Sequence, residues 1–296
     1  MQFRAISLSS CLLVICFLLM TCSPPEQEHV RKGKHLFNNG QIEMAIAEYN
    51  KALEIDQHNA EAYLERGIAY DEKGYVDKAL ADLNKAIELS PRYAEAYLNR
   101  GVFWFRKGNF DKAITDYTTA IEINPRADGA YNNRGLALLK KSNNERKRAL
   151  SDYNKAIEIN PHDEGIYLNR GNLWDKMRYY NKALSDYNKA IEINPRKFEP
   201  YNAIAWILAT SPNNELRNSS KAVKMANKAV QLNPCATTLD TLAAAYAETG
   251  NFEKAITTQK EAIALLKKEN KTEKMSNYSA RLKSYEAKKA WRDLEP

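Results

Sequence analysis

Cysteine and histidine, two side chains that often do chemistry in proteins, are few in this chain of 296 residues. The four histidines have no cysteine or carboxylate at the spacing of metal ligands; they are His29, His35, His58 and His162. The sequence has no glycine-rich loop that could hold a phosphate and no serine or cysteine nucleophile signature. We therefore predict no catalytic residues, no metal site, no cofactor and no small-molecule substrate, and a protein that is not an enzyme.

One cysteine has neighbours that predict a modification. Residues 11–20 are continuously apolar, a run too short to cross a bilayer core and of the length of a signal-peptide apolar segment. The run leads into Leu-Met-Thr-Cys at residues 19–22, which resembles the lipobox of bacterial lipoproteins. The resemblance implies a signal peptide at 1–21, a lipid such as palmitate on Cys22, and a short tether at 22–25.

Thr21 stands where the lipobox usually has Gly, Ala or Ser, so ordinary secretion and an uncleaved segment remain alternatives. Cys235 is left without an intrachain partner once the cysteines of the N-terminal segment are set aside. We therefore predict no disulfide framework, and the fold must be held by packing.

The charges argue against a nucleic-acid groove. Lys and Arg number 44 and Asp and Glu 37, a net charge of +7. Residues 267–296 hold nine basic and five acidic side chains, so this short segment carries more than half of the excess. A nucleic-acid binder usually collects its basic residues on one face, and the rest of this chain is nearly balanced.

Small residues and prolines recur along the mature chain. Glycines fall at intervals of 34, 34, 34 and 36, at Gly33, Gly67, Gly101, Gly135 and Gly171. Alanines and prolines recur in step with them, as in Ala-Ile-Glu-Ile-Asn-Pro at residues 120–125. The pattern resembles the tetratricopeptide repeat over residues 26–269. The resemblance implies an all-α, right-handed α-solenoid of about seven helix-turn-helix repeats.

The repeat marks divide the chain as follows: 26–59, 60–93, 94–127, 128–163, 164–197, 198–235 and 236–269. Two repeats are longer than the others, at 140–148 and 209–220, where we expect extended turns. Residues 270–296 leave the pattern but keep apolar residues at helical spacing, which predicts a capping helix over the last repeat.

A basic and an acidic residue recur together on the two helices of a repeat. Four repeats carry Arg at the seventh position and Asp on the second helix, as Arg66 with Asp82, Arg100 with Asp116, Arg134 with Asp152 and Arg170 with Asp186. The first repeat has Lys32 and Glu48 instead, and the last two repeats lose both charges. Charges that appear and disappear in pairs predict structural ion pairs within or between neighbouring repeats.

In this family the first helix of each repeat lines the concave face. Asn recurs there at intervals of 34 and 36, as Asn99, Asn133 and Asn169, and its amide can donate to and accept from a peptide group. The resemblance implies a groove for an extended peptide, and we include four more side chains at inner positions: Asn172, Phe105, Leu136 and Trp206. Bracing of adjacent helices is the alternative role of these Asn residues. The Lys, Asn and Arg set of the carboxylate-clamp version of the fold is not in register.

These observations favour a non-catalytic scaffold that binds a protein or peptide partner, with no nucleic-acid partner. By the lipobox resemblance it is a lipoprotein of the cell envelope that faces the periplasm, and Ser23 after the cysteine favours the outer membrane. The rival reading is a structural element whose basic C-terminal helix binds anionic envelope surfaces.

Overall fold

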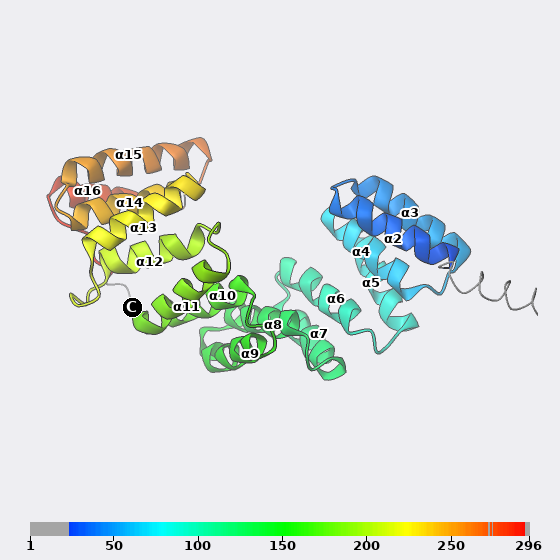
Figure 1. The fold of residues 1–296 in the computed structure, drawn as a ribbon. Coiled ribbons are helices and arrows are strands. Elements are labelled where there is room, and N and C mark those ends of the chain that lie inside the picture. Colours follow the sequence, from blue (N-terminus) through cyan, green and yellow to red (C-terminus); the bar gives the residue numbers. More distant parts are fainter. Residues whose placement is uncertain (1–23, 272, 274, 294–296) are drawn as a thin grey trace, which may run out of the picture. The chain divides into compact units, whose positions relative to one another are not determined.

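The computed structural model describes residues 24–271, 273 and 275–293. The predicted signal peptide and Cys22 lie outside this part of the chain. Every regular element among the described residues is helical, and the chain divides into two compact units, residues 1–145 and 146–296. The predicted fold class, an α-solenoid of helix-turn-helix repeats, is confirmed (Figure 1). Among the described residues, no helix combines the length and apolar character needed to span a bilayer.

The first unit contains three complete helical hairpins and the first helix of a fourth. Consecutive helices alternate between the first and the second helix of a repeat and lie side by side within a hairpin (Figure 1). Its elements are α2 (Pro25–Asn38), α3 (Ile42–Ile55), α4 (Ala60–Glu72), α5 (Val76–Leu89), α6 (Ala94–Arg106), α7 (Phe110–Ile123), α8 (Asp128–Lys141) and the short 3-10 helix η1 (Asn143–Glu145).

The second unit begins with the second helix of the fourth repeat and continues through three hairpins and a final helix. Its elements are α9 (Arg146–Ile159), α10 (Glu164–Lys176), α11 (Tyr180–Ile193), α12 (Glu199–Thr210), α13 (Ser219–Leu232), α14 (Ala236–Glu248), α15 (Phe252–Lys268) and α16 (Met275–Glu286). The helix α16 packs on α15 and so covers the last hairpin.

The turn inside five of the hairpins has a residue in the left-handed region of the backbone. Four repeats place glycine there, with φ between 75° and 80°, at Gly40, Gly74, Gly108 and Gly250. Glycine adopts this conformation without steric cost. The fifth repeat has Arg178 at the same position, with φ of 61°. An arginine in this conformation is uncommon, and its side chain has partners that are described below.

The two helices of a hairpin approach closely where one of them has glycine. A Cβ built on Gly101 would lie 2.5 Å from Cε1 of Tyr117, a ring that is 1% exposed. Gly67 is less constrained, because the facing residue is Leu83 and its nearest atom would lie at 3.1 Å. The recurring glycine therefore makes room for the tyrosine ring of the second helix in the third repeat.

The longer turn at 209–220 is held in place by an arginine. Residues 211–218 connect α12 to α13, and the Arg217 guanidinium donates to the main-chain oxygen of Ser211 at 2.9 Å. Its Nε also lies 2.9 Å from Oε1 of Glu248 on α14. The other long turn, at 140–148, contains η1.

The C-terminal helix is shorter than we predicted for 270–296. The helix α16 ends at Glu286, and Lys288 takes the left-handed conformation with φ of 54°. The amide of Lys289 then donates to the oxygen of Ser284 at 2.9 Å, a bond that closes a helix C-terminus and turns the chain away from the helix axis. Residues 287–293 leave the helix and run to α12, where the amide of Asp293 donates to the oxygen of Thr210 at 2.9 Å.

The glycine contacts lead to a matched pair of substitutions. We expect Gly101→Ala to destabilise the protein by about 1–2 kcal/mol, since the clash with Tyr117 exceeds the gain of about 1 kcal/mol in helix propensity. Gly67→Ala should be close to neutral, because the tight contacts of the new Cβ with Leu83 at 3.1 Å and the Ala79 oxygen at 3.3 Å offset the same gain in helix propensity. The midpoint of urea unfolding measures both changes, and equal midpoints for the two variants would contradict the explanation.

Candidate functional site

The recurring arginine and aspartate form two-pronged ion pairs inside a hairpin. Nε and Nη2 of Arg100 lie 2.9 and 2.8 Å from the two carboxylate oxygens of Asp116. The corresponding distances are 2.7 and 3.0 Å for Arg66 with Asp82. For Arg170 with Asp186 they are 2.8 and 2.7 Å. The three aspartates are buried, and a buried carboxylate needs hydrogen-bond partners such as these guanidinium groups.

The same arginine also reaches the preceding hairpin. Its third nitrogen, Nη1, donates to an asparagine oxygen on the second helix of the preceding repeat, over distances of 2.6–2.8 Å; the pairs are Arg66 with Asn50, Arg100 with Asn84, and Arg170 with Asn154. Arg134 donates instead to the Thr118 hydroxyl, at 3.1 Å. Asp152 belongs to the other unit, so its pairing with Arg134 stays a prediction. The arginine therefore ties three helices together.

At the start of the chain a glutamate occupies the place of the aspartate. Oε1 of Glu48 lies 3.0 Å from Lys32, and its other oxygen lies 2.7 Å from Nδ1 of His29. Burial alone would raise the pKa of Glu48, but hydrogen bonds with His29, Lys51 and Lys32 lower it to about 2. This histidine therefore braces the first hairpin.

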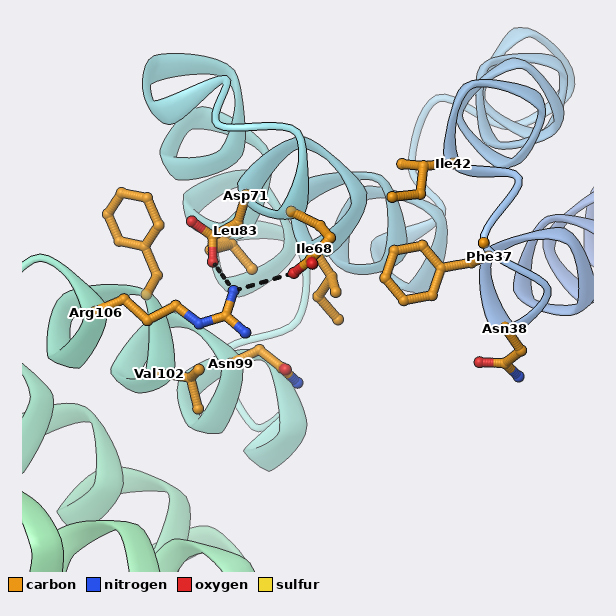
Figure 2. Close-up of a pocket in the computed structure, with 12 residues that line it drawn as sticks. Phe37, Asn38, Ile42, Ile68, Asp71, Leu83, Asn99, Val102 and Arg106 are labelled. Atoms are coloured by element: carbon orange, nitrogen blue, oxygen red, sulfur yellow. Dashed lines mark hydrogen bonds and ion pairs between the residues drawn. The ribbon is translucent and has the colours of Figure 1, made fainter. Parts of the chain in front are cut away.

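Two hollows lie at the inner positions of the first helices in unit one. The first, of about 390 Å³, has a floor of apolar side chains that include Phe37, Ile68 and Val102. Figure 2 shows Arg106 reaching from α6 toward α4, where its Nη1 lies 2.8 Å from Oδ2 of Asp71. The predicted groove residue Asn99 lines this hollow from α6, one turn before Val102 (Figure 2).

The second hollow, of about 240 Å³, lies between α6 and α8. It brings together three residues that we predicted for the groove: Phe105, Asn133 and Leu136. Val102 and Arg106 line both hollows, so the two are neighbours along one face of α6. Four of the seven predicted groove residues are thus grouped within unit one.

The asparagine amides make local hydrogen bonds. Nδ2 of Asn99 donates to the main-chain oxygen of Glu95 at 2.9 Å, one turn earlier on the same helix. Oδ1 of Asn133 accepts from Asn132 at 3.4 Å. In unit two, the Tyr187 hydroxyl donates to Asn172 at 2.9 Å. The bonds of Asn99 and Asn133 lie within their own helices and orient the amides, and only the bond of Asn172 joins two helices.

Unit two carries the remaining predicted groove residues, Asn169 and Asn172 on α10 and Trp206 on α12. Asn172 is exposed and Asn169 is half-buried. Trp206 is half-buried and contacts a residue that follows α16, since its Nε1 donates to Oδ2 of Asp293 at 3.2 Å. We did not foresee this contact, since no repeat marks residues 287–293.

Sequence reasoning also missed a buried ion pair at the end of unit two. Asp240 on α14 is 4% exposed, and its Oδ1 lies 2.7 Å from Nε of Arg281 on α16. The amide of Gln259 donates to the same oxygen at 2.7 Å. Burial raises the pKa of Asp240, and Arg281 opposes this effect. The sequence signal that could have indicated this pair is the lone Asp on the alanine-rich helix α14, which needs a basic partner such as one on α16.

These surfaces hold hydrogen-bonding and apolar groups, and the described residues contain no cluster of His, Cys, Asp or Glu that could hold a metal ion. The hollows offer apolar side chains for burial and amide groups for hydrogen bonds. Stacked helical hairpins with such inner surfaces define a class of protein–protein interaction scaffolds, and these are typically non-catalytic.

Models of the tetratricopeptide repeat match residues 94–126, 129–163, 165–197 and 235–272, and a further TPR repeat model matches 33–74 and 69–104. Together these matches cover about two thirds of the chain. The chain belongs to the tetratricopeptide repeat family. A search of curated proteins found no match.

Solved structures show the same fold at low identity. The structure described as a functional characterisation of Pseudomonas aeruginosa pilF matches with a TM-score of 0.63 and 19% identity, over 71% of this chain and 92% of that one. A tetratricopeptide repeat protein from Parabacteroides merdae matches with a TM-score of 0.58 and 18% identity, over 88% and 99%. A thermophilic TPR protein of Thermus thermophilus matches with a TM-score of 0.51 and 24% identity, over 59% and 94%.

The ion pair between Arg100 and Asp116 can be tested with a double-mutant cycle. We expect Asp116→Asn to destabilise the wild type by more than it destabilises an Arg100→Leu background, with a coupling energy of about 1–3 kcal/mol. The exposed pair Lys85 and Glu88 on α5, whose atoms lie 2.6 Å apart, is the matched control, with an expected coupling below about 0.5 kcal/mol. Equal coupling in the two cycles, measured by urea unfolding, would show that burial adds nothing to the pair.

Proposed function

We propose that this protein is a non-catalytic scaffold that binds an extended segment of a partner protein along the inner positions of its first helices. The observation that supports this most directly is the pair of adjoining hollows that share Val102 and Arg106 on α6. Both have apolar side chains in their lining, beside charged ones such as Asp71 and Arg106 in the first, and each includes a predicted groove asparagine, Asn99 in one and Asn133 in the other.

Such a surface suits an extended peptide for a physical reason. Alternate side chains of an extended segment can enter apolar hollows, while its peptide groups face the asparagine amides. The hydrogen bond from Asn99 to the oxygen of Glu95 orients the amide before a ligand arrives. Less side-chain entropy is then lost on binding.

We further propose that the chain is a lipoprotein of the cell envelope, held by lipid on Cys22 and facing the periplasm, with the outer membrane favoured. The support is the lipobox-like sequence at 19–22 and the residue Ser23 after it. The helix α2 begins at Pro25, so the first repeat would start directly beyond the anchor. Several acyl chains on one cysteine are enough for stable attachment, because each buried methylene contributes about 0.8 kcal/mol.

The alternative, binding of anionic surfaces through the basic C-terminal segment, has less support. Three of its basic side chains are already engaged with carboxylates: Arg281 with Asp240, Arg292 with Glu248, and Lys271 with Glu269. Arg281 is also buried, which removes it from any surface contact. The charge that can face a polyanion is therefore smaller than the sequence count suggests.

Affinity capture after crosslinking in the membrane fraction tests the groove. We expect the wild type to capture a partner that an Asn99→Ala, Asn133→Ala variant loses by at least tenfold. Asn188→Ala is the matched control, because Asn188 makes the same bond to the residue one turn earlier, at 2.7 Å, but on the second helix α11.

Circular dichroism establishes that each variant is folded. Retention of the same partner by the folded double variant would exclude the groove. Capture that declines steeply as salt rises from 0.05 to about 0.5 M would point instead to the basic segment, because screening weakens exposed charge contacts.

The anchor has its own test. Labelled palmitate should enter the wild-type protein and be absent from Cys22→Ala, and the wild type should fractionate with membranes. A Cys235→Ala variant controls for labelling of the other cysteine of the mature chain. Equal labelling of the wild type and Cys22→Ala would exclude lipid attachment at residue 22.

A further inference from the structure

The segment after α16 lies on the inner positions of unit two. We call residues 287–293 the tail. The Trp206 side chain and the Thr210 carbonyl on α12 bond to Asp293, at 3.2 and 2.9 Å. The neighbouring Arg292 lies 2.7 Å from Oε2 of Glu248 on α14.

These contacts use the same repeat positions as the hollows of unit one. Trp206 stands at the ninth position of its repeat, as Val102 does in the third repeat. Thr210 and Glu248 stand at the thirteenth position, which is that of Arg106. The tail therefore contacts, in unit two, the repeat positions that line the hollows in unit one.

The tail is anchored by both apolar and polar contacts. Ala290 and Trp291 pack against the hydrophobic core of unit two, and the ring of Trp291 lies beside the guanidinium of Arg281, at 5.9 Å from its centroid. The same guanidinium lies 5.3 Å from the centroid of Trp206. Arg281 thus stands between the aromatic ring of the face and that of the tail.

The turn residue of the fifth repeat departs from the repeat pattern and contacts the tail. Arg178 is the turn residue that holds the left-handed conformation where four other repeats have glycine. Its guanidinium donates to the main-chain oxygen of Asp293 at 3.1 Å and to the hydroxyl of Tyr180 at 2.7 Å. The backbone cost of a side chain at this position is offset by a bond that only a long donor can make to the tail.

We propose that the inner face formed by α10, α12 and α14 is a second peptide-binding site, distinct from the hollows of unit one, and that the tail is its intramolecular ligand. The partner it fits is an extended segment of the same chemistry, an aromatic residue followed by a basic and an acidic one, as in Trp291-Arg292-Asp293. The tail and such a partner compete for the face.

One neighbour of the tail carries a charge of the same sign as Asp293. Asp293 lies near Asp175 at the end of α10, and burial, followed by this like charge, raises the pKa of Asp175 to about 6. The other charged groups near Asp175 are Arg178 and Lys176, which lower its pKa, and Tyr187 of α11 faces it. Near neutral pH the tail is therefore held against a repulsion between two carboxylates.

Binding of a labelled peptide with the sequence of residues 286–296 tests the proposal by fluorescence anisotropy. The full-length chain in detergent should bind it weakly, because its own tail is present at a high effective concentration. A Trp291→Ala, Asp293→Ala chain, whose face is intact, should bind it at least tenfold more tightly. Lys283→Ala, an exposed change on α16, is the control and should match the wild type.

A second substitution in the tail-released chain separates binding from folding. Arg178→Gly relieves the left-handed backbone and removes the donor to the tail, so we expect unchanged or higher stability with at least fivefold weaker peptide binding. The proposal is overturned if Arg178→Gly leaves peptide binding unchanged. It is also overturned if the released chain binds the peptide no more tightly than the wild type does. Light scattering gives a further test. If the wild type is a dimer and the tail substitutions make it a monomer, the tail docks between copies and the proposal is overturned.

The proposal also predicts a pH dependence. Protonation of Asp175 removes the repulsion, so the peptide should bind the released chain more tightly at pH 5 than at pH 7.5. A peptide with Asn in place of Asp293 should lose most of this difference, and the opposite pH trend would contradict the assigned contact. Asn99→Ala with Asn133→Ala should leave tail-peptide affinity unchanged, so the two sites can fail independently.

Discussion

A helical hairpin of this length cannot bury both of its faces, so each repeat depends on its neighbours. The arginine at the seventh position meets this constraint, since one half-buried guanidinium binds the aspartate of its own hairpin and an asparagine of the preceding one. The donors of the planar guanidinium tolerate little change in the position of their acceptors. The contact therefore fixes the register of adjacent hairpins as well as their association. With the register fixed, side chains at the ninth and thirteenth positions return at regular intervals on the inner face.

The first repeat and the last two repeats replace the arginine–aspartate pair with other contacts. At the start, Glu48 collects His29 and two lysines in place of one arginine. At the end, Ile204 and Leu242 stand in the arginine position, and the charge pair moves to Asp240 with Arg281. The capping helix therefore contributes a buried counter-ion, in addition to covering apolar surface.

The periodic sequence predicts the hairpins, their turns and the charged partners within a hairpin, because each of these recurs with the repeat. It does not predict the asparagine acceptors of the preceding hairpin, since Asn50, Asn84 and Asn154 also look like ordinary solvent-facing residues. The contact between Trp206 and Asp293 joins residues 87 apart in sequence and occurs once, so no internal comparison could indicate it. The helix that we predicted over 270–296 ends early, at Glu286, and the left-handed Lys288 that follows it also occurs outside the repeats, so no internal comparison could indicate it.

The predicted groove residues therefore divide according to what surrounds them in each unit. In unit one, Asn99, Asn133, Phe105 and Leu136 line hollows walled by residues of the repeats themselves. In unit two, the equivalent inner position is Trp206, and the chain's own C-terminal residues lie on it. In the function that we propose, the repeat sets where a ligand binds. The residues that depart from the repeat, such as Arg178 and Trp206, would then set which ligand the face of unit two accepts.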